Sequence, residues 1–337
     1  MTPPWHIVAM GSAPGEAAHL SALCVAARKR GQSLVAWAQN ENAARQLGAT
    51  GAAVRRFRAG PEIASTLRQE GFSALVACSS YTAHAFFRDA RGLEGPVVCI
   101  DSSCMPWSRS REHDLTRVDR FLVAMPDEVF LRGLERNVGA YSIPPSVLER
   151  IRPVGWFAEP SDEPPEDLVL CYFSRGAVPW GFWWGQTIGA AIELAAARCP
   201  GRRWVWVGNP GIPLPALVEL RRGWVEEPEM EALHRRAALL LCHEGQVTIG
   251  RAAVAGARVL CVSSGFVFRH DVGLVYAGRE AQGFSRAGVV ETIHGPAPAA
   301  AIARRIVGLL EAGRATPHPG GGALRAVLEV EALIGGR

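Results

Sequence analysis

The sequence predicts an α/β protein built from two doubly wound parallel sheets. Short apolar segments alternate with segments of helical length along the whole chain. This alternation is typical of parallel strands that are covered by helices on both faces. An acidic, proline-rich stretch at 158–167 interrupts the alternation once, as a linker between two domains would. A length of 337 residues is also long for one hydrophobic core and sufficient for two.

The first half begins with a strand expected at His6–Met10, a loop at Gly11–Glu16 and a helix at Ala17–Arg30. Gly31 is expected to end that helix because glycine tolerates the left-handed conformation that follows many helices. Further short apolar runs, bounded by polar or glycine-rich segments, predict strands at Ser33–Trp37, Ala74–Cys78, Val97–Ile100, Arg120–Ala124 and Arg152–Val154.

The same alternation restarts after the linker. Strands are expected at Leu168–Phe173, Trp204–Val207, Leu239–Cys242 and Arg258–Val262, and helices at 186–198, 229–237 and 323–334. We therefore expect an N-terminal domain over 1–157, a linker over 158–167, a C-terminal domain over 168–316, and a C-terminal helical segment over 317–337 that packs back toward the N-terminal domain.

Charge and cysteine usage exclude several classes of protein. The net charge is a mild +4, and no basic run alternates with aromatic residues, so we expect no nucleic-acid partner. The eight cysteines are scattered through apolar segments without a C-x-x-C pair, which indicates buried, reduced thiols. The start of the chain does not resemble a secretion signal, and no apolar run is long enough to span a bilayer. A cytoplasmic location follows as the expectation.

Residues 239–262 predict an anion-binding turn. The apolar strand there breaks at Gly245, and a helix begins whose first turn carries Thr248. A helix N-terminus exposes backbone N–H groups and the positive end of the helix dipole, and a threonine hydroxyl adds another donor. The arrangement predicts a site for a phosphate or diphosphate group.

The same segment resembles the nucleotide-diphosphate motif of GT-B glycosyltransferases, H-G-G-x-G-T-x-x-E-A-x-x-x-G. His243, Gly245 and Thr248 match that motif, whereas Glu244 and Gln246 replace small or His/Asn residues. Other segments are similar, in the same order and spacing, to the branch that includes the bacterial enzyme transferring N-acetylglucosamine to lipid I. These segments read FSALVACSS, GPVVCIDSS, IRPVGWF, LVLCYFSRGA and WVWVGNPG.

The resemblance implies two Rossmann-like domains facing across a cleft. It implies an inverting, metal-independent glycosyltransferase of hexosyl or N-acetylhexosaminyl type. The donor it implies is a nucleotide-sugar, in this family a UDP-sugar, and no other cofactor is implied. The acceptor is an unidentified small molecule or lipid, and peripheral membrane contact is expected only for a lipid acceptor. Two alternatives keep the fold: a nucleotide-sugar hydrolase or 2-epimerase, and a non-catalytic subunit with a degenerate nucleotide pocket.

One further position departs from the motif by reversing its charge. The family glutamate that usually holds the ribose hydroxyls of the donor falls on Arg251. A carboxylate accepts hydroxyl protons, whereas a guanidinium only donates. Three interpretations stay open: the ribose is bound from another direction, the donor carries extra negative charge, or nucleotide binding has been lost.

Two carboxylates are candidates for proton transfer in the N-terminal domain. Glu16 corresponds to the family's histidine beside the reacting sugar, although a glutamate in a first helical turn also complements the dipole without any catalytic role. Asp101 ends a strand, where ligands of parallel sheets bind, or it caps a turn. His19 and Ser103 are candidate acceptor contacts, and a lone helical histidine such as His19 is more often structural.

The remaining candidates belong to the C-terminal domain. Ser174, Arg175 and Gly176 follow its first strand, where backbone amides and an arginine can meet a diphosphate, although Arg175 also fits an ordinary surface position. His270 and Asp271 fall near the family's pair that touches the donor sugar. Trp183, in an aromatic run, is a candidate acceptor contact or a core residue. The nine histidines form no H-x-x-x-H or H-x-H pair, so no metal site is expected.

Overall fold

The chain folds into two compact units. Unit 1 comprises Met1–Ala158 and Gly320–Arg337, and unit 2 comprises Glu159–Pro319. The structure is a computed structural model, and it describes residues 3–10, 14–78, 83–101, 114–134, 145–160, 164, 166–173, 181–208, 214–222, 225–243, 245–263, 267–270, 273–276, 284–294 and 297–336. The chain therefore enters unit 2 once and returns to complete unit 1.

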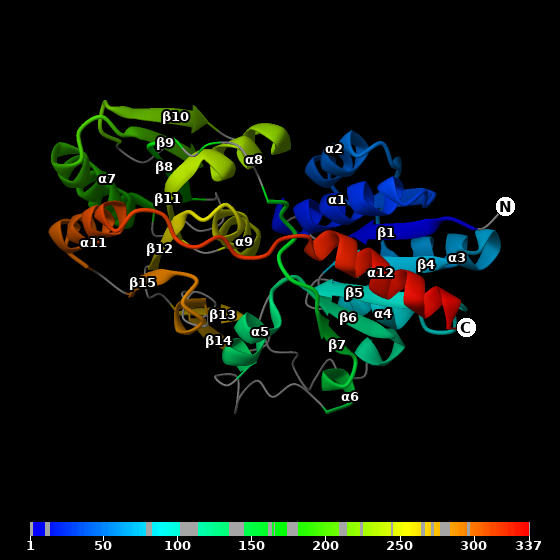
Figure 1. Ribbon diagram of the computed structural model, residues 1–337. Helices are drawn as coiled ribbons and strands as arrows, with labels where there is room; N and C mark the ends of the chain where they lie inside the picture. The colour runs from blue at the N-terminus through cyan, green and yellow to red at the C-terminus, as the bar shows by residue number, and fades with distance from the viewer. Residues whose placement is uncertain are drawn as a thin grey trace. The chain divides into compact units, whose positions relative to one another are not determined.

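Unit 1 contains a seven-stranded sheet in the order β3-β2-β1-β4-β5-β6-β7 (Figure 1). All of its strand pairs are parallel. The strands are β1 (Trp5–Ala9), β2 (Leu34–Ala38), β3 (Ala53–Arg56), β4 (Ala74–Cys78), β5 (Val97–Asp101), β6 (Arg120–Val123) and β7 (Ile151–Pro153). Three of the central strands, β1, β4 and β5, are buried at every position, as expected for strands covered on both faces.

The described helices of unit 1 connect these strands, except for the last helix, which follows unit 2. They are α1 (Pro14–Lys29), α2 (Glu41–Ala49), α3 (Gly60–Glu70), α4 (His84–Asp89), the 3₁₀ helix η2 (Asp114–Arg117), α5 (Asp127–Leu134), α6 (Pro145–Leu148) and α12 (Gly322–Gly335). Apolar side chains of α1, α2 and α12 share one hydrophobic core with β1, β2 and β4. Asn40 caps α2 by accepting a hydrogen bond from the backbone N–H of Ala43.

The last helix, α12, packs against α1 in unit 1, although it follows the whole of unit 2 in the chain (Figure 1). Its start is fixed by backbone hydrogen bonds: the N–H of Gly321 donates to Ala158 O, and that of Gly322 to Trp156 O at 2.8 Å. Arg30, which directly follows α1, and Glu331 of α12 form an ion pair at 2.7 Å. The core of unit 1 is thus closed by residues that follow unit 2 in the chain.

Unit 2 contains a six-stranded parallel sheet in the order β10-β9-β8-β11-β12-β15. Its strands are β8 (Leu168–Phe173), β9 (Arg203–Gly208), β10 (Val218–Arg222), β11 (Ala237–Cys242), β12 (Arg258–Ser263) and β15 (Glu291–His294). A separate antiparallel pair consists of β13 (Val267–His270) and β14 (Gly273–Tyr276).

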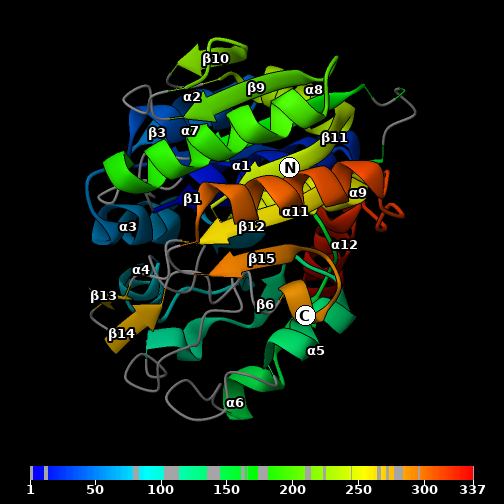
Figure 2. The same cartoon turned by 90° about the vertical axis from the view of Figure 1, so that its left-hand side faces the viewer.

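Helices cover both faces of this sheet. The helices α7 (Gly181–Arg198) and α11 (Ala299–Glu311) lie side by side on one face, where they share a core with β8, β9, β11 and β12 (Figure 2). The helices α8 (Glu227–Arg236) and α9 (Gln246–Val254) contact each other and pack on the other face. Of the helices that the structure describes, none is both long and apolar enough to cross a membrane.

The predicted fold class is confirmed, and its elements differ mainly at their ends. Two predicted strands, Ala74–Cys78 and Leu168–Phe173, have the expected bounds as β4 and β8. The first helix begins at Pro14 and not at Ala17, so Glu16 lies in a first helical turn and not in a loop. Proline is favoured at the first helical position because its missing N–H is not needed there.

Candidate functional site

Each parallel sheet has a topological switch point, where two neighbouring strands send their chains in opposite directions across the sheet. In unit 1 the switch point lies between β1 and β4, and in unit 2 it lies between β8 and β11. Open α/β sheets bind ligands outside the carboxyl ends of their strands at such points. The predicted site residues that the structure describes can be placed relative to these two positions.

In unit 1, both predicted acid/base residues lie at the carboxyl edge of the sheet. Glu16 is in the first turn of α1, directly after β1, and Asp101 is the last residue of β5. Their exposed fractions are only 7% and 1%. Burial of this kind restricts the access of water to the two carboxyl groups.

Both carboxyl groups lie within electrostatic reach of the thiol of Cys78, at the end of β4. Burial raises the pKa of Cys78 well above its usual range, and the negative charges of Glu16 and Asp101 raise it further. The same two side chains, with Cys78, add to the effect of burial on the pKa of Cys99 in β5. Glu16 and Asp101 therefore both act on the end of β4 beside the switch point, although they are far apart in sequence.

His19 lies one turn along α1 from Glu16. Its ring is buried and meets the ring of Phe157 edge to face, with 5.2 Å between the ring centroids. This contact favours a packing role for His19. A contact between His19 and an acceptor stays a prediction.

In unit 2, the predicted anion site forms the start of α9, beside the switch point. Gly245 precedes the helix with a φ of +134°, a backbone conformation that residues other than glycine rarely adopt. Within the described part of the chain, no side chain caps this helix start. A helix start of this kind is where an anionic ligand can accept hydrogen bonds from backbone N–H groups.

The side chains around this helix start include a neutral imidazole. His243 directly follows β11, and burial lowers the pKa of its imidazole. Its Nε2 atom is buried and has no hydrogen-bond partner among the described residues. Gln246 and Thr248 are both buried, and Thr248 keeps an exposed fraction of 7%. His243 can therefore donate a hydrogen bond to an anion at this position without being charged.

Arg251 is engaged by carboxylates of the neighbouring helix. Its guanidinium forms an ion pair with Glu227, at the start of α8, and lies 3.9 Å from a carboxylate oxygen of Glu231. The side chain of Arg251 is only 10% exposed. Because two glutamates already oppose its charge, Arg251 offers little positive potential to an extra phosphate.

Two further side chains surround the Arg251–Glu227 pair. Tyr172, near the end of β8, is half-buried. Burial raises the pKa of its hydroxyl, the charge of Arg251 lowers this pKa, and the charge of Glu227 raises it. His234 of α8 is buried, and its Nδ1–H donates to Met230 O at 2.8 Å. Burial and the charge of Arg251 lower the pKa of His234 to about 3, so this ring is neutral. Glu227 and Tyr172 lie outside the motif, so the sequence pattern gives no signal for either residue.

The other predicted contacts cannot be placed in the same detail. Trp183 belongs to α7 and His270 ends β13, but the side chains of both lie outside the described residues. The predicted residues that lie wholly outside the described part of the chain are Ser103, Ser174, Arg175, Gly176 and Asp271.

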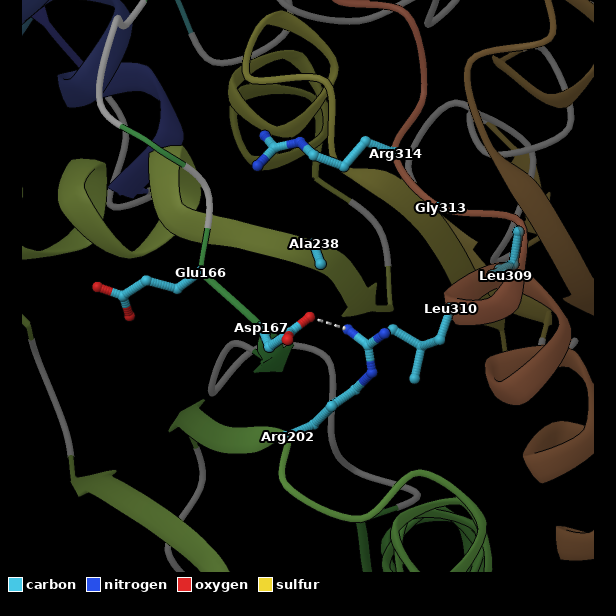
Figure 3. A pocket seen from close by; sticks show the side chains of 8 residues that line it. All are labelled: Glu166, Asp167, Arg202, Ala238, Leu309, Leu310, Gly313 and Arg314. Carbon is cyan, nitrogen blue, oxygen red and sulfur yellow. Dashed lines mark hydrogen bonds and ion pairs between the residues drawn. The ribbon is translucent and has the colours of Figure 1, made fainter.

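A pocket of about 210 Å³ lies at the opposite edge of the sheet of unit 2. Asp167 and Ala238 line it at the amino ends of β8 and β11, and Arg202 reaches across to Asp167 with an ion pair of 2.7 Å (Figure 3). Leu309, Leu310 and Arg314 line its remaining sides. This pocket is separate from the predicted donor-binding residues, which lie at the carboxyl ends of these strands.

Two parallel sheets covered by helices, one in each unit, are typical of a known fold class. The chain has the GT-B fold, because solved structures of glycosyltransferases match nearly its whole length at 13–15% identity. No protein-family model and no curated protein matches the sequence.

Three of these structures illustrate the similarity. LpCGTa in complex with UDP has 15% identity and a TM-score of 0.66, over 98% of this chain and 94% of its own. A UDP-glucosyltransferase from Polygonum tinctorium that glucosylates indoxyl has 15% identity and a TM-score of 0.65, over 99% of each chain. The spinosyn rhamnosyltransferase SpnG with thymidine diphosphate has 13% identity and a TM-score of 0.59, over 99% of this chain and 96% of its own.

Proposed function

We propose that this protein is an inverting, metal-independent glycosyltransferase that moves a hexosyl or N-acetylhexosaminyl group from a nucleoside-diphosphate sugar to a hydroxyl acceptor. The observation that carries the proposal is the start of α9 at the switch point of unit 2, where Gly245 has a φ of +134° and the buried Nε2 atom of His243 has no hydrogen-bond partner among the described residues. The solved structures with UDP or thymidine diphosphate support a diphosphate as the ligand of such a site.

In the proposed reaction, unit 2 holds the donor. The backbone N–H groups and the helix dipole of α9 stabilise the diphosphate as its bond to the anomeric carbon breaks, and His243 donates one more hydrogen bond. This stabilisation grows as negative charge develops on the leaving group. Preorganised donors of this kind replace the function that a divalent ion performs in other transferases.

Unit 1 supplies the base. The acceptor oxygen attacks the anomeric carbon from the side opposite the leaving diphosphate, and its proton passes to the carboxylate of Glu16. Asp101 is the second carboxylate proposed for this unit, and it acts on the same thiol, that of Cys78, as Glu16 does. One bond to the anomeric carbon forms as another breaks, so the configuration of the sugar inverts. The products are the glycosylated acceptor and a nucleoside diphosphate.

Binding of the leaving group provides the first test. UDP or thymidine diphosphate at about 100 times its dissociation constant should stabilise the folded protein by about 2.7 kcal/mol, measured by thermal unfolding. Gly245→Ala should lose this stabilisation, because alanine disfavours the φ of +134° at the helix start. Gly201→Ala is the matched control. This glycine of unit 2 also has a positive φ, +84°, but it lies beyond the C-terminal end of α7.

If neither nucleotide stabilises the native protein, the donor site proposed here does not exist. If a nucleotide binds and a nucleotide-sugar is cleaved equally fast with and without acceptor alcohols, the enzyme is a hydrolase of this fold. Replacement of Glu16 by glutamine should lower the transfer rate by about 100-fold or more while leaving nucleotide binding unchanged.

A further inference from the structure

The position of Arg251 on α9 relates it to the proposed donor. Arg251 follows Thr248 by three residues, so it shares the face of the helix with Thr248 and lies about one turn, ~5 Å, further from the helix start. In a nucleoside diphosphate the ribose is the next group after the phosphates. A donor with its phosphates at the start of α9 therefore brings its ribose to the turn that carries Arg251.

A ribose presents two neighbouring hydroxyl groups, and a carboxylate is the side chain that accepts hydrogen bonds from both. Arg251 cannot do so, because a guanidinium has no acceptor. It is, however, in ion-pair contact with Glu227, which comes from the start of α8. The carboxylate needed at this turn is thus present, on a different helix.

Glu227 is better placed for this role than the second glutamate near Arg251. Its charge and that of Arg251 both act on the hydroxyl of Tyr172, near the end of β8 at the switch point. Glu231, by contrast, lies 3.9 Å from Arg251 and one turn further along α8. The side chain of Glu227 keeps an exposed fraction of 25%, so a ligand can reach it although Arg251 is covered.

We propose that Glu227 binds the 2′- and 3′-hydroxyl groups of the donor ribose and that Arg251 is the positioning residue that holds its carboxylate there. The inference rests on the proposed function. It assigns the donor to the ribonucleotides, such as UDP-sugars, and against deoxyribonucleotides such as thymidine diphosphate sugars. In this chain the carboxylate that the motif places on α9 is replaced by Arg251, and Arg251 orients the carboxylate of Glu227 on α8.

The test compares the dissociation constants of UDP and 2′-deoxy-UDP, measured by calorimetry. These ligands differ only in the 2′-hydroxyl. The native protein should bind UDP at least about tenfold more tightly, since a hydrogen bond to a charged group is lost with the deoxy ligand. Glu227→Gln, which has the same shape, should reduce the preference to that of a neutral hydrogen bond, about threefold. Glu229→Gln, at an exposed position of the same helix, should keep the native preference.

An exchange variant, Arg251→Glu combined with Glu227→Arg, separates the two roles. It keeps the ion pair and returns the carboxylate to α9, so it should keep the preference for UDP, whereas Arg251→Gln alone should reduce it. Equal binding of UDP and 2′-deoxy-UDP by the native protein, or an unchanged preference in Glu227→Gln, overturns the ribose assignment and leaves the glycosyltransferase proposal intact. Failure of the native protein to bind either nucleotide overturns both.

Discussion

Replacement of Gly322 by alanine tests how α12 closes unit 1. A Cβ atom on residue 322 would overlap the carbonyl oxygen of Gly155 and lie 2.6 Å from that of Trp156, whereas ordinary contacts are 3.4–4 Å. These neighbours are backbone atoms, so no side-chain rotation relieves the clash. The start of α12 or the segment 155–156 has to move, and two hydrogen bonds, from Gly321 N–H to Ala158 O and from Gly322 N–H to Trp156 O, are strained.

The cost follows from these contacts. Overpacking against fixed neighbours costs about 1–3 kcal/mol, and each weakened hydrogen bond adds about 1 kcal/mol at most. We expect Gly322→Ala to lower the free energy of unfolding of unit 1 by about 2–4 kcal/mol. Helix propensity alone predicts the opposite sign, a gain of about 0.5–1 kcal/mol, because alanine favours helices over glycine.

Urea unfolding, followed by hydrogen exchange in α1 and α12, measures the effect and locates it in unit 1. Gly335→Ala is the control, because it changes the same residue type in the same helix where no atom lies within 4 Å of the added methyl group. A Gly322→Ala protein that is as stable as the native one, or more stable, would refute the close docking of α12 on residues 154–158.

Three further predictions concern single side chains. Burial, with a smaller effect of Arg55, lowers the pKa of His6 to about 4. Below pH 6.5 the unfolded chain therefore binds a proton at His6 that the folded chain does not bind, so stability is full above pH 6.5 and should fall by about 2 kcal/mol between pH 6.5 and pH 5. The substitution His6→Gln should remove this loss from the pH profile of urea unfolding. Asn40→Ala should lower the unfolding free energy by about 1 kcal/mol through loss of the α2 cap, whereas Asn40→Asp should preserve it. Gly308→Ala should raise the thermal midpoint of unit 2, because this glycine lies inside α11 with no atom within 4 Å of the added methyl group, and a decrease would contradict the open surface found there.

The fold class could be predicted because the central strands are continuous apolar runs. Ala74–Cys78 is buried at every position and stands out from the polar residues around it. The strand β3, Ala53–Arg56, was not predicted for the converse reason: it lies at the edge of the sheet, is partly exposed and contains two arginines. The side chains of an edge strand are often partly exposed, so few of its positions have to be apolar and hydrophobic periodicity does not reveal it.

The candidate site was predictable in position but not in its pairings. The motif around Gly245 predicts where a helix starts at the end of a strand, because that depends on local sequence. The interaction between Arg251 and Glu227 joins residues on two helices, and several glutamates of α8 were equally available by sequence. A charge that departs from a motif can be recognised in the sequence, whereas the side chain that neutralises it requires the three-dimensional structure.

The division of unit 1 into two stretches has a consequence for how the protein reaches its native state. Residues 320–337 are translated after the whole of unit 2, yet α12 supplies part of the hydrophobic core of unit 1. Unit 2 is contiguous and can complete its folding during synthesis, whereas the nascent N-terminal half must wait with an uncovered apolar surface along α1. A chaperone that shields this surface during translation would therefore assist the half that is made first.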